Sequence, residues 1–120
     1  MGQEADEHFN RGNVLAARGL HAEAEAAYRE ALRLEPRDIQ AMSNLAGCLR
    51  QLGRPGEAIA LYGAALALQP GEAQLHANLS AALHAAGRFE DAVAGLRRLL
   101  EIEPRHAGAH RNLGWLLLTL

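Results

Sequence analysis

The sequence predicts an all-α fold in which helical hairpins stack into a solenoid. Asparagine recurs at positions 10, 44, 78 and 112 of the 120-residue chain, so that each step is 34 residues. Within each period, apolar residues follow one another at steps of three and four, which is the spacing of one face of an α-helix. A repeated unit of this size cannot bury its apolar face alone, so we expect neighbouring units to stack around a continuous core.

Five further positions of the period hold one residue type or size in almost every copy. Positions are counted from residues 5, 39, 73 and 107. The eighth position holds a small residue (Gly12, Ala46, Ser80 and Gly114), the fifteenth holds glycine (Gly19, Gly53 and Gly87) and the twentieth holds alanine (Ala24, Ala58 and Ala92). The twenty-fourth holds tyrosine or leucine (Tyr28, Tyr62 and Leu96), and the thirty-second holds proline (Pro36, Pro70 and Pro104). This register predicts one domain over 1–120, with full repeats at 5–38, 39–72 and 73–106 and a partial fourth repeat or capping helix at 107–120.

Each full repeat is expected to hold two helices whose ends are marked by glycine and proline. The first helix should end at the glycine, because glycine readily takes the left-handed conformation that closes a helix. The second should end before the proline, which lacks an N–H group. Pro55 suits the first turn of a helix, where no N–H is needed. Small residues at the eighth and twentieth positions allow the two helices to approach closely, and residues 107–120 should form one further first helix.

These offsets resemble those of the tetratricopeptide repeat family over almost the whole chain. The resemblance implies a right-handed α-solenoid whose first helices line a concave groove, and a protein-interaction scaffold rather than an enzyme. Several features depart from the family pattern, among them Arg11 in place of the usual leucine of the seventh position. The usual large aromatic residue of the fourth position is replaced by His8, Met42, His76 and His110, and the small residue of the twenty-seventh position is Leu99 in the third repeat.

The recurring asparagines stand at the sixth position, which the resemblance places on the groove. A side-chain amide carries both a donor and an acceptor, as the peptide backbone does. Packed helices lie about 8–10 Å apart, and an extended chain advances about 3.3–3.6 Å per residue, so such a ladder would meet a bound backbone at about every third residue. Ladders of this kind are a feature of O-GlcNAc-transferase-like repeat arrays, which the sequence resembles most closely. The predicted peptide-binding residues are Asn10, Asn13, Asn44, Asn78, Asn112, Gln40, Gln74, Arg50, His84 and Arg111.

Other interpretations stay open at this point. The asparagines can instead hydrogen-bond within the helix pairs or to water. The chain can be a substrate-presenting accessory domain of a larger enzyme such as a glycosyltransferase, or a self-assembly module. A second binding mode in this family clamps peptide C-termini with cations, at places that hold Phe9, Gln74 and Asn78 here, so we expect no tight binding of such tails.

The last predicted helix is apolar around nearly its whole circumference. Its large apolar side chains are Leu113, Trp115, Leu116, Leu117, Leu118 and Leu120. One side can pack on the third repeat, and the other must meet water or a partner. We therefore expect a longer repeat array or a homo-oligomer that forms through Leu113, Trp115, Leu116, Leu117 and Leu120.

Composition and motifs indicate no nucleic acid, membrane, metal or cofactor. The net charge is −2, and the longest strongly apolar run, WLLLTL, is far shorter than the roughly 20 residues of a membrane span. The pairs His106–His110 and Ser80–His84 lack the further ligands or partners of a metal or catalytic site. Cys48 lies in an apolar stretch and is expected to be a buried thiol. We expect a cytoplasmic protein, and the use of arginine for all 12 basic residues suggests GC-rich, bacterial coding.

Overall fold

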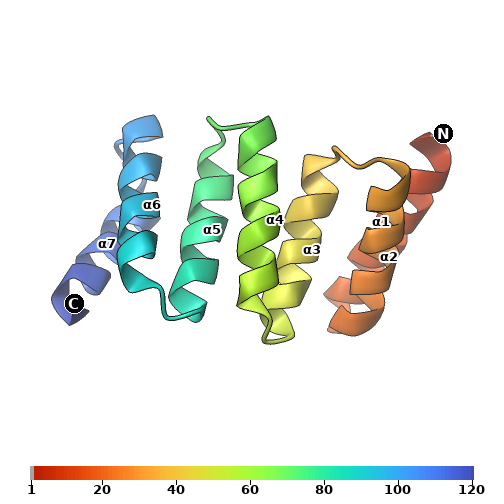
Figure 1. Cartoon of the computed structure of the whole chain (residues 1–120), viewed down its shortest axis with the longest axis horizontal. Coiled ribbons are helices and arrows are strands. Elements are labelled where there is room, and N and C mark those ends of the chain that lie inside the picture. The colour runs from red at the N-terminus through yellow and green to blue at the C-terminus, as the bar shows by residue number, and fades with distance from the viewer. Residues whose placement is uncertain (1) are drawn as a thin grey trace.

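The computed structural model describes residues 2–120 and contains seven α-helices over that range. They are α1 (Gly2–Ala17), α2 (His21–Leu34), α3 (Ile39–Gln51), α4 (Pro55–Leu68), α5 (Ala73–Ala85), α6 (Phe89–Ile102) and α7 (Ala107–Thr119). Figure 1 shows them side by side in chain order, as a row of helical hairpins. The all-α solenoid predicted from the sequence is therefore confirmed. Helices α3, α5 and α7 begin at residues 39, 73 and 107, while α1 begins at Gly2, ahead of Ala5.

The turn inside each hairpin is closed by a glycine in the left-handed conformation. Gly19, Gly53 and Gly87 all have a φ of 77°. The amide that follows each glycine bonds back to the preceding helix: Leu20 N donates to Leu15 O at 3.0 Å and Arg54 N donates to Leu49 O at 2.8 Å. Any other residue would strain this backbone, which explains why glycine recurs at the fifteenth position.

The turn between repeats is stabilised by side chains that follow the proline. Asp38 Oδ1 and His106 Nδ1 cap their helices by accepting from Ala41 N at 3.2 Å and Ala109 N at 3.0 Å. The ring Nε2 of His76 lies 2.9 Å from the carbonyl oxygen of Pro70, and His110 makes the same contact with Pro104 at 2.7 Å. Histidine at the fourth position therefore ties α5 and α7 to the turns before them, which a phenyl ring could not do.

The core lies between the two layers of helices and is filled largely by alanine, leucine and tyrosine. The largest fully buried side chains are Tyr28, Tyr62, Leu45, Leu49 and Leu99. Gly12 allows α1 to rest on Tyr28, because a Cβ there would lie 2.6 Å from the ring carbon Cε1. In the third repeat the close approach is made by Gly95, where a Cβ would lie 2.6 Å from Ser80 Oγ. Small residues thus set the spacing between paired helices.

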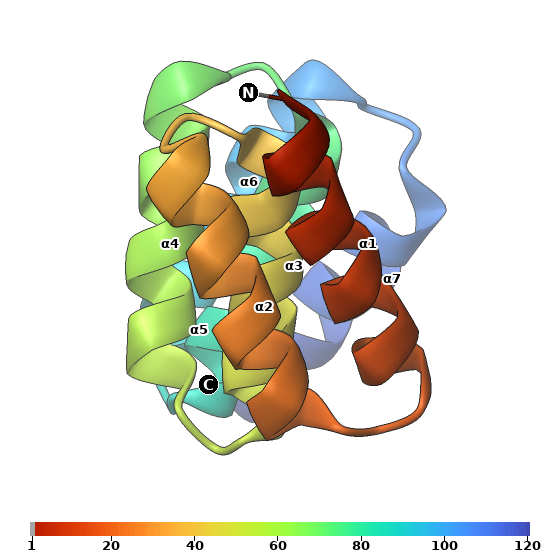
Figure 2. The same ribbon diagram turned by 90° about the vertical axis from the view of Figure 1, so that its right-hand side faces the viewer.

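The array is elongated, with extents of 45 × 26 × 20 Å. Figure 2, which looks along the row, shows α2 and α4 in one layer and α1 and α3 in the other. None of the helices over residues 2–120 is long and apolar enough to cross a membrane.

Candidate functional site

A polar hollow of about 470 Å³ lies over the first helices of the first three repeats. Four of the predicted binding residues line it: Asn13, Asn44, Arg50 and Asn78. Tyr28 and Tyr62 of the second helices reach it from the core side. The structure therefore brings together predicted residues from α1, α3 and α5.

Asn13 is the centre of a hydrogen-bond cluster at one end of this hollow. Its Oδ1 accepts from the Tyr28 hydroxyl at 2.6 Å and from Asn44 Nδ2 at 3.0 Å. These bonds connect α1 to α2 within the first repeat and to α3 of the second. Burial raises the pKa of the Tyr28 phenol above its ordinary value, which further favours the protonated, hydrogen-bond-donating form. Asn44 takes part in this cluster as a donor, which leaves its Oδ1 available as an acceptor for another partner.

Asn78 is held by a hydrogen bond within its own helix. Its Oδ1 accepts from Gln74 Nε2 at 2.9 Å, one turn away on α5, which leaves both N–H groups of Asn78 available.

The predicted binding residues that do not line the polar hollow fall into two groups. His84 and Asn112 line a second hollow, described below. Asn10, Gln40, Gln74 and Arg111 are exposed and lie outside both hollows.

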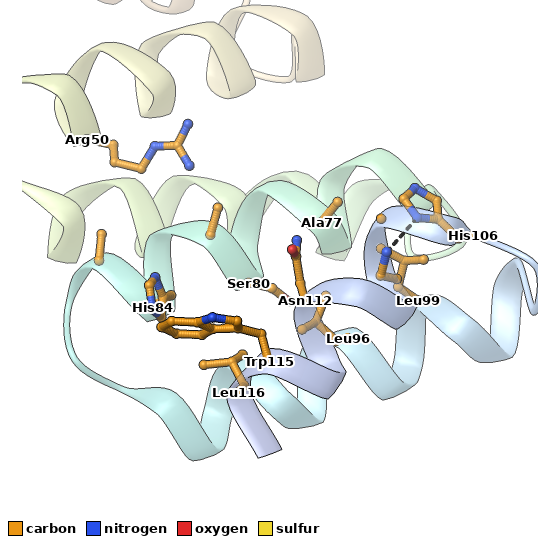
Figure 3. Close-up of a pocket in the computed structure, with 14 residues that line it drawn as sticks. Arg50, Ala77, Ser80, His84, Leu96, Leu99, His106, Asn112, Trp115 and Leu116 are labelled. Carbon is orange, nitrogen blue, oxygen red and sulfur yellow. Dashed lines mark hydrogen bonds between the residues drawn. The ribbon is translucent and has the colours of Figure 1, made fainter. Parts of the chain in front are cut away.

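The second hollow is apolar, measures about 410 Å³ and lies beside the first. Figure 3 shows Ser80 and His84 of α5, Leu96 and Leu99 of α6, and Asn112, Trp115 and Leu116 of α7 around it. Arg50 extends toward it from α3 and lines both hollows. Leu99 replaces the alanine found at this position in the first two repeats and is fully buried. The two hollows share Arg50 as a lining residue.

Sequence comparison places this architecture in a family. Models of the tetratricopeptide repeat match residues 9–73 and 49–116. The chain belongs to the tetratricopeptide repeat family. A tetratricopeptide repeat domain is typically a non-catalytic protein-interaction module, and no individual curated protein sequence matches this one.

Solved tetratricopeptide repeat structures share the fold. The first such domain of Spaghetti (RPAP3), bound to an HSP90 peptide, is 24% identical over 98% of this chain and 96% of that chain, with a TM-score of 0.88. The Arabidopsis OM64 domain is 18% identical over 99% of this chain and 98% of that one, with a TM-score of 0.91. Thermobaculum terrenum O-GlcNAc transferase is 29% identical over 96% of this chain but only 22% of its own, with a TM-score of 0.82.

The final helix of the array has one buried side and one exposed side. Leu116 is 4% exposed and packs into the core of the third repeat, with Leu113 half-buried beside it. Trp115 is 59% exposed and Leu118 is 88% exposed, and Leu117 and Leu120 are exposed as well. Leu116 therefore lies in the core of the chain, away from the exposed side on which an interface with a second chain would form.

A cluster of charged groups on α2 and at the start of α4 has structural partners. Glu25 Oε1 accepts from Arg54 Nη1 at 2.9 Å, and Glu25 Oε2 accepts from Arg29 Nε at 2.9 Å. Although burial opposes ionisation, these two guanidinium groups hold the pKa of the Glu25 carboxyl below its ordinary value. Burial raises the pKa of the Cys48 thiol, as expected for a thiol inside the core.

The histidine and serine pairs seen in the sequence do not converge. Ser80 Oγ is buried against α6, whereas the exposed His84 ring is tilted to Phe89 and edge-on to Trp115, with centroid distances of 5.3 Å and 6.1 Å. His106 Nδ1 is occupied as a helix cap, and His110 Nε2 is bonded to the turn. The described residues, 2–120, contain no group of three potential metal ligands.

Sequence reasoning missed two contributors to the groove. The Tyr28 hydroxyl orients Asn13, and buried tyrosines usually find such a partner, so the recurring tyrosine was a usable signal. The other is the position of Arg50 between the two hollows, which depends on how three successive first helices pack.

Proposed function

We propose that the chain binds an extended segment of a partner protein along the two hollows, with Asn44 and Asn78 as contacts to the segment's backbone. The observation that carries this proposal is the shared polar hollow of Asn13, Asn44, Asn78 and Arg50. The existing hydrogen bonds orient Asn44 and Asn78 without using all their amide groups. Pre-oriented donors and acceptors lose little freedom on binding, which favours affinity.

The spacing of the helices supports backbone recognition. Asn44 and Asn78 stand on α3 and α5, which are successive first helices of the array. Helices that pack side by side are about 8–10 Å apart, which corresponds to about three residues of extended chain at about 3.3–3.6 Å each. One asparagine per repeat can therefore contact every third peptide unit of a ligand without reading its side chains.

The similar RPAP3 domain, which is bound to an HSP90 peptide, supports a peptide ligand in general. The HSP90 peptide itself is not the expected ligand here. A carboxylate clamp needs cations where this chain has Phe9, Gln74 and Asn78. We expect that peptide to bind this chain at most weakly, because the cations of the clamp that would hold its terminal carboxylate are missing.

The test compares wild type with Asn78→Ala and with the Asn44→Ala, Asn78→Ala double variant on an array of unstructured synthetic peptides. Each lost hydrogen bond should cost about 0.5–1.5 kcal/mol of binding free energy. Asn78→Ala should leave the free energy of unfolding almost unchanged, because Asn78 bonds only to a neighbour on its own helix. Asn10→Ala, on the same position of the first repeat but outside both hollows, is the matched control.

The Asn44 substitution alone is less decisive, because it also removes the bond to Asn13 between the first two repeats. If Asn78→Ala leaves every peptide affinity at the wild-type value while Asn44→Ala lowers stability, the asparagines hold the helices together and do not bind peptide.

A second candidate function is self-association through α7. It is favoured by the exposed apolar side of that helix, formed by Trp115, Leu117, Leu118 and Leu120. An accessory role in a larger glycosyltransferase is favoured by the similarity to O-GlcNAc transferase, of which the matched region is 22%. The accessory role is compatible with peptide binding in the groove, whereas self-association would use Trp115, which also lines the apolar hollow.

A further inference from the structure

The apolar hollow has the size and walls of a binding site for a side chain. Its volume of about 410 Å³ falls within the roughly 300–1,000 Å³ of small-ligand sites. Leucine side chains of α6 and α7 form apolar walls, and the Trp115 ring stands at one end with the His84 ring edge-on to it at 6.1 Å. Alanines of α5, among them the Ala77 labelled in Figure 3, line it with small side chains. Such a surface gains most from a large apolar group that displaces its water.

Arg50 supplies positive charge at the rim of this hollow. Among the salt bridges formed within residues 2–120, none involves Arg50. It is half-buried, so water screens its charge less than that of a fully exposed arginine. No aspartate or glutamate lines either hollow in the described part of the chain. The groove therefore has an unneutralised cation beside an apolar hollow, which is complementary to a carboxylate next to an apolar side chain.

We propose that the partner segment is acidic and carries a bulky apolar anchor, with the anchor in the hollow between α5 and α7 and a neighbouring carboxylate on Arg50. The inference rests on the proposed function, since it identifies the kind of segment that the groove selects. Asparagine contacts to the backbone hold any extended segment, whereas the anchor and the carboxylate distinguish one segment from another. A planar guanidinium can accept a carboxylate through two parallel hydrogen bonds, which adds directional preference to the charge.

The test uses synthetic peptides that share one Gly/Ser frame and differ at two places. One peptide carries Phe next to two Asp residues, the second carries Phe next to two Asn, the third carries Gly in place of Phe beside the two Asp, and the fourth carries neither. Titrations follow the fluorescence of Trp115, the one tryptophan of the chain, and the anisotropy of a dye on the peptide. We expect the first peptide to bind roughly tenfold tighter than the second and roughly tenfold tighter than the third.

Two variants assign these preferences to the two parts of the site. Arg50→Gln should abolish the difference between the Asp and Asn peptides and keep the preference for Phe. Ala81→Leu places a larger side chain at the hollow and should abolish the preference for Phe while keeping that for Asp. Arg97→Gln removes an exposed arginine of α6 that lines neither hollow, and should change neither preference.

The outcomes separate this inference from the proposed function. Equal binding of all four peptides would overturn the inference and leave backbone binding in the groove intact. Binding of none of them at the highest soluble concentration would overturn both. Preferences that survive Arg50→Gln and Ala81→Leu would place the acidic and apolar contacts elsewhere and would also overturn the inference. Circular dichroism of each variant checks that the helices are retained.

Discussion

At the scale of single residues, the fold depends on a few positions where no larger side chain fits. Gly12 is such a position, because the ring of Tyr28 fills the space that a Cβ would need. Tyr28 cannot move away easily, since it is buried and its hydroxyl is bonded to Asn13. The same ring thus sets the distance between α1 and α2 and the orientation of a groove amide.

Gly12→Ala is expected to destabilise the chain by about 1–3 kcal/mol, as overpacking of a core does. The measurement is the free energy of unfolding in urea. Gly63→Ala is the control, because Gly63 lies inside α4 with nothing within 4 Å of a Cβ. That substitution should instead stabilise the chain by up to about 1 kcal/mol, through the better helix propensity of alanine. Equal effects of the two substitutions would show that Gly12 is not held close to Tyr28.

At the scale of elements, neighbouring repeats are held by polar contacts as well as by the core. Arg54 precedes α4 and reaches back to Glu25 of α2, while also pairing with Glu57 of its own helix. Helical spacing in the sequence shows charge pairs within one helix and does not show those between helices. The turns were predictable, since glycine and proline act locally, whereas Glu25–Arg54 depends on how α2 and α4 pack.

Glu25→Gln is expected to lower stability at neutral pH, by at most about 1 kcal/mol because both arginines are partly in water. The folded pKa of Glu25 is below its ordinary value of 4.5. The contribution of this carboxylate is therefore present above pH 4.5 and is lost as the pH falls through the folded pKa.

Urea unfolding of wild type and Glu25→Gln from pH 7 down to about pH 3 checks this expectation. The two curves of stability against pH should converge at the acid end, and added salt should shrink their difference at pH 7. The control is Glu101→Gln, at an exposed site of α6 outside the ion pairs described. Its curve of stability against pH should run parallel to that of wild type. If the free energies of unfolding of wild type and Glu25→Gln differ by the same amount at every pH, the ion-pair explanation is contradicted.

At the scale of the whole molecule, the solenoid was predictable because its period, turns and apolar faces all agree on one structure. The ladder of four asparagines was also visible as a pattern, but their environments differ in the folded chain. Asn44 and Asn78 lie in the polar hollow, Asn112 lines the apolar one, and Asn10 lies outside both. Asparagines that are equally spaced in the sequence therefore do not have the same surroundings. Their surroundings depend on contacts between different repeats, such as the hydrogen bond between Asn13 and Asn44.

The exposed side of α7 leads to a prediction about assembly. Leu117→Glu with Leu118→Glu should lower the average mass in sedimentation at high protein concentration, because charged side chains oppose burial of that side between two chains. Wild-type mass and Trp115 emission should both change on dilution, since Trp115 belongs to the same exposed side. Ala60→Glu with Ala67→Glu adds the same charge to exposed sites of α4 and should leave the mass unchanged. A wild-type chain that is monomeric at every concentration, with emission unaffected by dilution, would rule out self-association through α7 and leave the groove as the interaction site.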